Sequence, residues 1–188
     1  MRDALVWSPD RKSIASKISD VTAFGLAPGV SVGLVLAGTL DAPSAAALID
    51  DLTPIVETMV VTQWVTRALK IGTARTRPYT HFTDRRSDDD HLSFVSGHTS
   101  RAFAVATSAG MIARARGYKA EPYIWIGGMT LAVASGYFRI AADRHYMTDV
   151  MAGAAIGVAA GLTVPLLMRR TNVEAMPRAS GFAFSGVW

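Results

Sequence analysis

Basic side chains and histidines gather in three short stretches that lie far apart in the chain. The first is KIGTARTRP, in which Lys70 and Arg77 are followed by Pro78. A lysine supplies a point charge and an arginine a planar fork of donors, and the pair suits the oxygens of a phosphate group. Taken alone, so loose a pattern is equally typical of a solvated basic loop.

The second stretch is FVSGHTSRAF, where Ser96, Gly97 and His98 precede an apolar run. We expect a helix to begin there, and the free N–H groups of a helix start favour an anion. Ser96 could donate its hydroxyl, Gly97 lets the backbone approach a ligand, and His98 could protonate a leaving group. The alternative is that Ser96 only caps the helix and His98 is a half-exposed neighbour.

The third stretch is FRIAADRHYMTD, which carries Arg139, Asp143, Arg144, His145 and Asp149. If a helix begins near Asp143, His145 and Asp149 share one of its faces. An aspartate that binds one ring nitrogen fixes the tautomer and leaves the other nitrogen free to attack. Arg139 could close over a phosphate, whereas we expect Asp143 and Arg144 to be helix-start and surface charges. By itself the His–Asp spacing also fits a surface pair.

Five apolar segments must position these stretches. Val21 to Leu40 is 20 residues without a charge, long enough to span a bilayer. The other segments are about Leu52 to Leu69, Ala102 to Ala113, Tyr123 to Phe138, and Val150 to Met168. Strand signals are weak. We therefore predict an all-α, membrane-embedded bundle of about five long helices, with the three stretches forming an active site at one end. The alternative is a soluble bundle with very apolar helices.

The composition agrees with one domain that binds an anionic partner. The chain has 188 residues, of which 50% are hydrophobic and 18% charged, and its net charge is +4. It has no cysteine, which excludes disulfides, thiolate metal sites and cysteine nucleophiles. We expect a single domain over residues 1–188. Its parts would be an N-terminal flanking segment at 1–20, a polar active-site loop region at 70–97 and a C-terminal tail at 169–188.

Taken together, the three stretches resemble the motifs of the type 2 phosphatidic acid phosphatase (PAP2) superfamily, which is related to bacterial acid phosphatases and vanadium haloperoxidases. That family's pattern is Lys-x6-Arg-Pro, then Pro-Ser-Gly-His, then Ser-Arg-x5-His-x3-Asp. The matching residues are Lys70, Arg77, Pro78, Ser96, Gly97, His98, Arg139, His145 and Asp149. Val95 departs from the family's proline, and Phe138 from its serine. We expect the first change to loosen the helix start and the second to remove one phosphate hydrogen bond.

The resemblance implies a metal-independent phosphatase that hydrolyses a phosphomonoester or a pyrophosphate through a phosphohistidine intermediate. In this mechanism His145 is the nucleophile, Asp149 orients it, and His98 acts first as general acid and then as general base. The phosphate oxygens would be held by Lys70, Arg77, Ser96, Gly97 and Arg139. No cofactor or metal is expected, because cationic side chains take the place of a metal ion.

The remaining acidic cluster does not suggest a metal site. Asp88, Asp89 and Asp90 are adjacent, and we expect them to form a solvated face of the loop region.

A site at the end of membrane helices favours a lipid substrate. Candidates are phosphatidic acid, phosphatidylglycerol phosphate, a polyprenyl pyrophosphate and the phosphates of lipid A. We expect the bilayer as a partner and no nucleic acid. The resemblance implies an integral protein of the bacterial inner membrane whose site faces the periplasm or exterior, although the count of basic residues would place it in the cytoplasm. The alternatives are a soluble acid phosphatase, a vanadium-dependent haloperoxidase with the same pocket, and a non-catalytic membrane scaffold.

Overall fold

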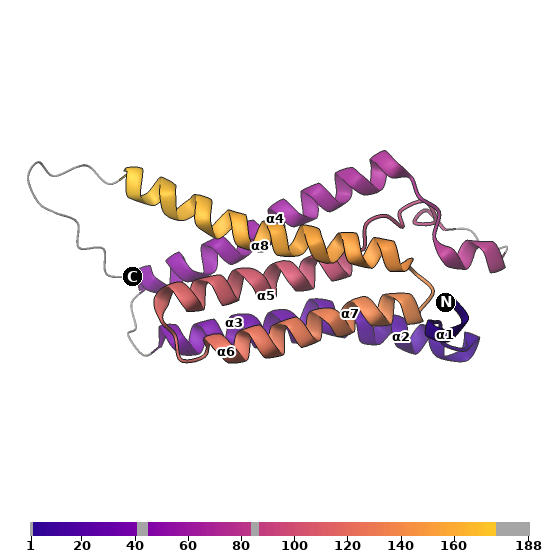
Figure 1. Cartoon of the computed structure of the whole chain (residues 1–188), viewed down its shortest axis with the longest axis horizontal. Coiled ribbons are helices and arrows are strands. Elements are labelled where there is room, and N and C mark those ends of the chain that lie inside the picture. Colours follow the sequence, from indigo (N-terminus) through magenta and orange to yellow (C-terminus); the bar gives the residue numbers. More distant parts are fainter. Residues whose placement is uncertain (1, 41–44, 84–86, 176–188) are drawn as a thin grey trace, which may run out of the picture.

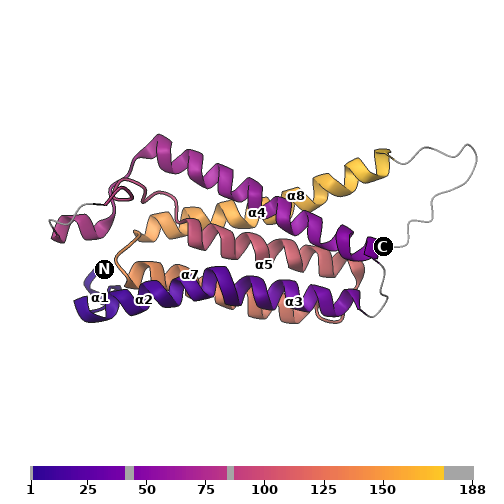
Figure 2. The same ribbon diagram turned by 180° about the vertical axis from the view of Figure 1, so that it is seen from behind.

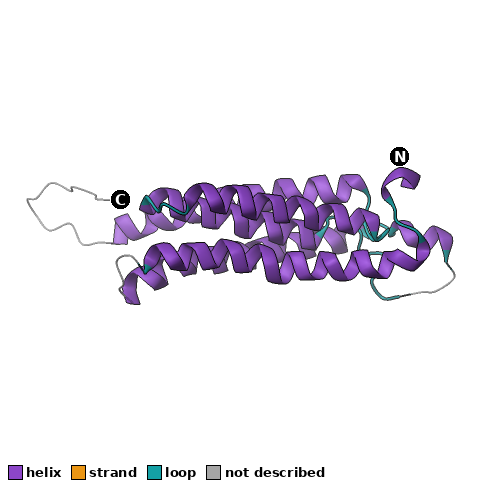
Figure 3. Ribbon diagram, turned by 90° about the horizontal axis from the view of Figure 1, so that it is seen from below, coloured by secondary structure: helices purple, strands orange, loops and turns teal. Residues whose placement is uncertain are grey.

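The computed structural model describes residues 2–40, 45–83 and 87–175, and every regular element within these ranges is helical. The longer elements of the described residues form five rods, and Figure 3 shows that they run roughly along the same axis. They are α2 (Pro9–Val21) continued by η1 (Thr22–Leu26) and α3 (Ala27–Thr39); α4 (Ala45–Thr73); α5 (Gly97–Arg116); α6 (Glu121–Tyr123) continued by η3 (Ile124–Gly128) and α7 (Met129–Ala141); and α8 (Met147–Ala175). The short elements α1 (Arg2–Leu5) and η2 (Pro78–Phe82) complete the set.

The first rod begins earlier than its apolar run. We expected residues 1–20 to flank the bundle, but α2 is helical from Pro9, at the position where a proline fits a helix start. Its Ala15 and Ser19 are buried, and the Ser19 hydroxyl donates to the carbonyl of Ser135 on α7 at 3.3 Å. The charged segment is therefore an extension of the first rod, and Asp20 lies inside a helix.

Helix α5 occupies the centre of the bundle (Figure 1). It packs on α4 and α8 on one side and on α3 and α7 on the other. Figure 2, the view from behind, shows the first rod running alongside it. Glycines on α8 allow the closest of these contacts. A Cβ at Gly153 would lie 2.7 Å from the carbonyl oxygen of Ser96, and one at Gly157 would overlap that of Ser100. Small residues at this contact let the two backbones approach each other.

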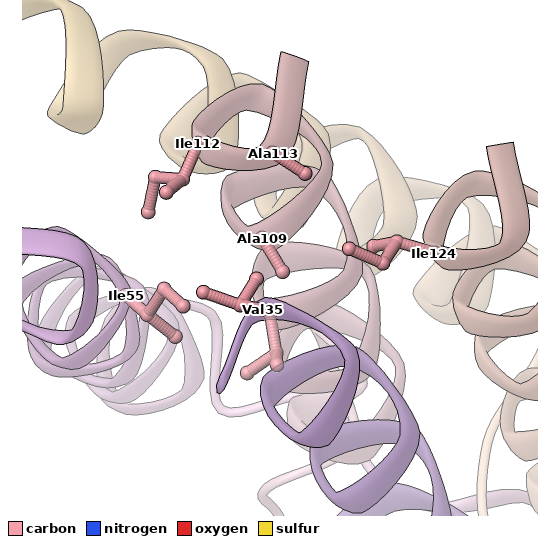
Figure 4. Packing of buried hydrophobic residues seen from close by; sticks show 7 residues of the cluster. Val35, Ile55, Ala109, Ile112, Ala113 and Ile124 are labelled. Carbon is pink, nitrogen blue, oxygen red and sulfur yellow. The ribbon is translucent and has the colours of Figure 1, made fainter. Parts of the chain in front are cut away.

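A hydrophobic cluster joins four of the rods (Figure 4). Val35 from the first rod, Ile55 from α4 and Ile124 from η3 pack around Ala109 and Ala113 of α5. All five side chains are buried, at most 1% exposed. This cluster fixes the spacing of the rods that carry the polar end groups.

Within the described ranges, three segments are long and apolar enough to cross a membrane: Pro9–Thr39, Glu121–Ala141 and Met147–Met168. Of the two remaining long helices, α5 is largely buried in the bundle. Helix α4 carries charges but presents large apolar side chains outward, including Val56, Val60 and Trp64, which is 73% exposed. An outward apolar surface of this kind suits a bilayer.

All three motif stretches lie at one end of the bundle, as predicted (Figures 1 and 2). The first follows the end of α4, the second precedes α5, and the third connects α7 to α8. The predicted C-terminal tail, 169–188, begins as the last turns of α8, and residues 176–188 lie outside the described residues.

Candidate active site

One pocket, with a volume of about 210 Å³, brings together six of the eight predicted site residues. Helix ends supply most of them: the last turns of α4 and α7 and the first turn of α5. The six are Lys70, Arg77, Gly97, His98, Arg139 and His145. The other two, Ser96 and Asp149, are buried beside the pocket without lining it.

Two of the cations in this pocket carry buried donor groups that make no hydrogen bond within the described residues. The Lys70 ammonium donates to the carbonyl of Leu92 at 2.6 Å, and Arg77 Nε donates to that of Asp89 at 2.8 Å. Arg77 Nη1 and Arg139 Nε are buried, and neither has a hydrogen-bond partner among the described residues. An unpaired buried donor is costly, about 1–3 kcal/mol and more when charged. The pocket is therefore suited to an anion that would accept these bonds.

His145 lies in the loop between α7 and α8. We expected it on a helix that begins near Asp143, but α8 begins at Met147, two residues after His145. The loop still directs Nδ1 of His145 toward Asp149, 3.6 Å from its Oδ2 atom. Because Nδ1 faces the carboxylate, Nε2 is the ring nitrogen available to a ligand in the pocket.

Burial keeps the His145 ring neutral. It lowers the pKa of His145 from 6.5 to about 3, and Arg139, Lys70 and Arg77 act in the same direction, while Asp149 opposes them. Because burial disfavours the charged imidazolium, the His145 ring is neutral at neutral pH and can act as a nucleophile.

Asp149 is held from several sides. Its Oδ2 accepts hydrogen bonds from the Ser93 hydroxyl at 2.6 Å and from the Tyr146 backbone N–H at 3.0 Å. Its Oδ1 accepts from Arg75 at 2.7 Å. The sequence reasoning missed Arg75 and Ser93. The position of Arg75 between the two cations of the first motif was the signal that could have found it.

His98 has an aspartate partner of its own. Its Nε2 atom lies 2.7 Å from Oδ1 of Asp20, and its ring meets the ring of Phe24 edge-on, with centroids 4.8 Å apart. The same Asp20 oxygen lies 3.6 Å from Arg139. Asp20 directly precedes the uncharged run Val21 to Leu40, and the sequence reasoning gave it no role, so its contact with His98 was also missed.

The second motif is arranged differently from the prediction. The Ser96 hydroxyl is buried and hydrogen bonded to that of Thr99 at 2.8 Å, and its backbone N–H donates to the carbonyl of Asp149 at 3.0 Å. Its contact with phosphate stays a prediction. A Cβ on Gly97 would lie 3.7 Å from Lys70, an ordinary contact, so packing does not require a glycine here. Close approach of a ligand to the Gly97 backbone stays a prediction.

Phe138, which replaces the family's serine, is turned away from the pocket. Its ring packs edge-on against Trp7, with centroids 5.7 Å apart, and it is not among the residues that line the pocket.

Two acidic residues predicted to be solvated are buried. Asp143 is 1% exposed, has a φ of +59° and accepts a bond from Lys12 at 2.8 Å, because the first rod reaches back to this loop. Asp90 is 3% exposed and accepts bonds from the Tyr79 hydroxyl at 2.5 Å and the Ser87 backbone at 3.0 Å. Both predictions of surface position were wrong, since each carboxylate orders a loop at the site.

An apolar pocket of about 530 Å³ adjoins the charged one between the first rod and α4. The two pockets share Phe24, Gln63 and Arg101. Arg101 donates to the Gln63 side chain at 2.7 Å, and its guanidinium lies over the Phe24 ring at 4.3 Å. The apolar pocket is otherwise lined by Pro28, Met59, Val60 and Trp64. A charged head and an apolar chain of one ligand would fit this arrangement.

Comparison with known proteins identifies relatives. A family model described as the PAP2 superfamily matches residues 51–172. A lipid A 1-phosphatase of Porphyromonas gingivalis is 33% identical over 103 residues, which make up 55% of this chain and only 22% of that protein. A transmembrane PAP2 type phosphatidylglycerolphosphate phosphatase from Bacillus subtilis has a similar structure, with a TM-score of 0.62 and 18% identity over 95% of this chain and 85% of the other. The predicted membrane-embedded, all-α fold is confirmed.

Proposed function

The chain belongs to the PAP2 superfamily, and on this premise we propose that it is a phosphatase that hydrolyses a phosphomonoester or pyrophosphate of a lipid. The observation that carries the proposal is the pair of buried guanidinium groups with unpartnered donors beside a neutral histidine. Arg77, Arg139 and Lys70 would hold the phosphoryl oxygens, and the first N–H groups of α5 would add donors at the helix start. These cations supply charge that a metal ion would otherwise provide, so we expect no metal requirement.

The first chemical step would form a phosphohistidine. Nε2 of His145 attacks phosphorus, the bond between phosphorus and the leaving oxygen breaks, and His98 gives its proton to that oxygen. Asp149 lies at Nδ1, so it would stabilise the positive charge that develops on the ring.

The second step would return the histidine to its starting form. His98, now neutral, takes a proton from water as the water oxygen attacks phosphorus. The bond between nitrogen and phosphorus breaks, and inorganic phosphate leaves. One histidine thus remains the nucleophile while the other exchanges the proton in both directions.

The apolar pocket supports a lipid substrate. It meets the charged pocket at Arg101, so a phosphate bound among the cations would place an attached chain along the apolar wall of α4. The relatives agree, since the names of both describe phosphatases of lipid phosphates.

Phosphate release in detergent with EDTA present tests the function. The panel would contain phosphatidic acid, phosphatidylglycerol phosphate, a polyprenyl pyrophosphate, lipid A and the soluble p-nitrophenyl phosphate. We expect release from at least one lipid at a kcat/KM well above that for the soluble ester. No release from any member would contradict the proposal.

A matched pair of substitutions separates the chain-binding wall from the rest of α4. Val56 and Val60 are 56% and 50% exposed on the same helix, but only Val60 lines the apolar pocket. We expect Val60→Glu to raise KM for the lipid about tenfold, because one charge at an apolar contact costs on the order of 1.4 kcal/mol or more. Val56→Glu should leave KM unchanged, and neither should change hydrolysis of p-nitrophenyl phosphate. Equal effects of the two variants would exclude this pocket as the chain site.

We also propose that the protein is embedded in a bacterial inner membrane with the site facing the periplasm. Because the chain has no cysteine, single cysteines can report the sidedness. Ser87 is exposed at the site end, and Lys119 is exposed at the opposite end. In spheroplasts, an impermeant maleimide should label Ser87→Cys and not Lys119→Cys; the reverse pattern would place the site in the cytoplasm.

A further inference from the structure

We propose that Asp20, which lies outside all three motifs, is a positioning residue that holds the general acid His98 and favours its protonated form. The inference rests on the proposed function, because His98 has a leaving group to protonate only in that reaction. It concerns a contact between residues 78 positions apart, at 2.7 Å between Oδ1 of Asp20 and Nε2 of His98.

The first rod fixes the His98 ring from two directions. Asp20 hydrogen bonds to Nε2, and Phe24, four residues further along the same rod, meets the ring edge-on at an interplanar angle of 85°. With Nε2 engaged, Nδ1 is the nitrogen left for the leaving group. The rod therefore selects which nitrogen of His98 exchanges the proton.

The charges around His98 explain why a carboxylate is needed. Burial lowers the pKa of His98 from 6.5 to about 4, Arg139 on α7 and Arg101 on α5 act in the same direction, and the hydrogen bond and charge of Asp20 oppose them. The pocket is further lined by the basic residues Arg67, Lys70 and Arg77, with the carboxylate of Asp89 on its loop side. Among the described residues, Asp20 is the carboxylate that hydrogen bonds to the ring, so it offsets part of these effects and favours the imidazolium that must act as the acid.

The proton balance of the step is simple. As the bond between phosphorus and the leaving oxygen breaks, the proton on Nδ1 of His98 moves to that oxygen. The proton on Nε2 stays in its hydrogen bond to Asp20, which remains ionised throughout. In the second step Nδ1 takes a proton from the attacking water, and Asp20 again stabilises the resulting imidazolium.

Leaving-group dependence separates this role from a structural one. An alkyl phosphate, such as a lipid monoester, needs a protonated leaving oxygen, whereas p-nitrophenolate leaves without a proton. Asp20 is 52% exposed, so we expect Asp20→Asn to lower kcat/KM for the lipid ester, which reports the step in which the leaving group departs, about tenfold, less than the roughly 10²- to 10⁴-fold that a whole acid catalyst contributes. The effect on p-nitrophenyl phosphate should be much smaller. The alkaline limb of the pH–rate profile should move to lower pH, because His98 then loses its proton more easily.

Two further variants complete the test. Asp10→Asn is the matched control, because Asp10 is an exposed carboxylate on the same helix that does not line the pocket. It should behave as wild type. Asp20→Glu keeps the charge and should recover part of the lost rate. Melting temperatures of all variants in detergent would show whether each one is folded.

Several results would overturn the inference. Unchanged kinetics of Asp20→Asn would do so, and so would equal losses on both esters, which indicate a structural role. Faster turnover and tighter vanadate inhibition would show that the carboxylate blocks the pocket instead. His98→Ala separates this failure from that of the function. If Asp20→Asn gives one of these results while wild type releases phosphate and His98→Ala loses kcat/KM selectively for the alkyl ester, only the role of Asp20 is refuted. A wild type without phosphate release refutes the function itself.

Discussion

His145→Ala is expected to abolish phosphate release from every substrate. Removing a nucleophile that acts in concert with its partners costs about 10⁴- to 10⁶-fold in kcat in well-studied hydrolases. His145 lines the pocket and its pKa is lowered by burial, so the wild-type ring is neutral and able to attack. The initial rate with saturating lipid phosphate, measured with EDTA present, checks this.

The control for this prediction is a second histidine of the same region. His91 is exposed in the loop before α5 and does not line the pocket. His91→Ala should therefore retain wild-type turnover. Turnover of His145→Ala equal to that of wild type would refute the assignment of the nucleophile.

Asp149→Asn is expected to reduce kcat by up to about 10⁴-fold, the loss that follows when the aspartate of a Ser–His–Asp triad is changed to asparagine. The carboxylate faces Nδ1 of His145 and also accepts bonds from Ser93 and Arg75. An amide would direct an NH₂ group at one of these donors and would remove the charge that stabilises the phosphorylated ring. The kcat for the lipid phosphate should fall, while inhibition by vanadate should weaken much less, because the phosphate-binding cations are untouched.

A buried aspartate at the other end of the bundle provides the comparison. Asp51 is 1% exposed and paired with Arg116 at 2.7 Å and with the Tyr118 hydroxyl at 2.5 Å. Asp51→Asn removes a buried, paired carboxylate as Asp149→Asn does, and it should lower the melting temperature without changing kcat. If both variants lost turnover in proportion to stability, Asp149 would have a structural role only.

The sequence was sufficient for the class of fold and for the main residues of the pocket. Long apolar segments of the right length predict helices that cross a bilayer, and alternating their direction brings three motif stretches to one end. That reasoning placed Lys70, Arg77, His98, Arg139 and His145 together, and the structure has them around one pocket.

The residues that were missed depend on which helix faces meet. Asp20 reaches His98 only because α2 continues the first rod and packs on α7, and no local pattern encodes a contact between residues 78 positions apart. Charged residues before an apolar run were read as a flank, although a helix tolerates them on its solvated face. Asp143 and Asp90 were placed at the surface because a carboxylate is usually solvated, but each has a donor from a distant segment or a loop neighbour.

The central claim is that His145 carries the phosphoryl group during turnover. The most direct measurement is to mix the enzyme with a ³²P-labelled lipid phosphate in EDTA, quench with alkali, in which phosphohistidine survives, and locate the label by peptide mass spectrometry. We predict label on His145 in wild type and none in His145→Ala. Two results would contradict the account. One is phosphate release by the wild type while neither wild type nor His98→Ala carries any label, and the other is label on a residue other than His145.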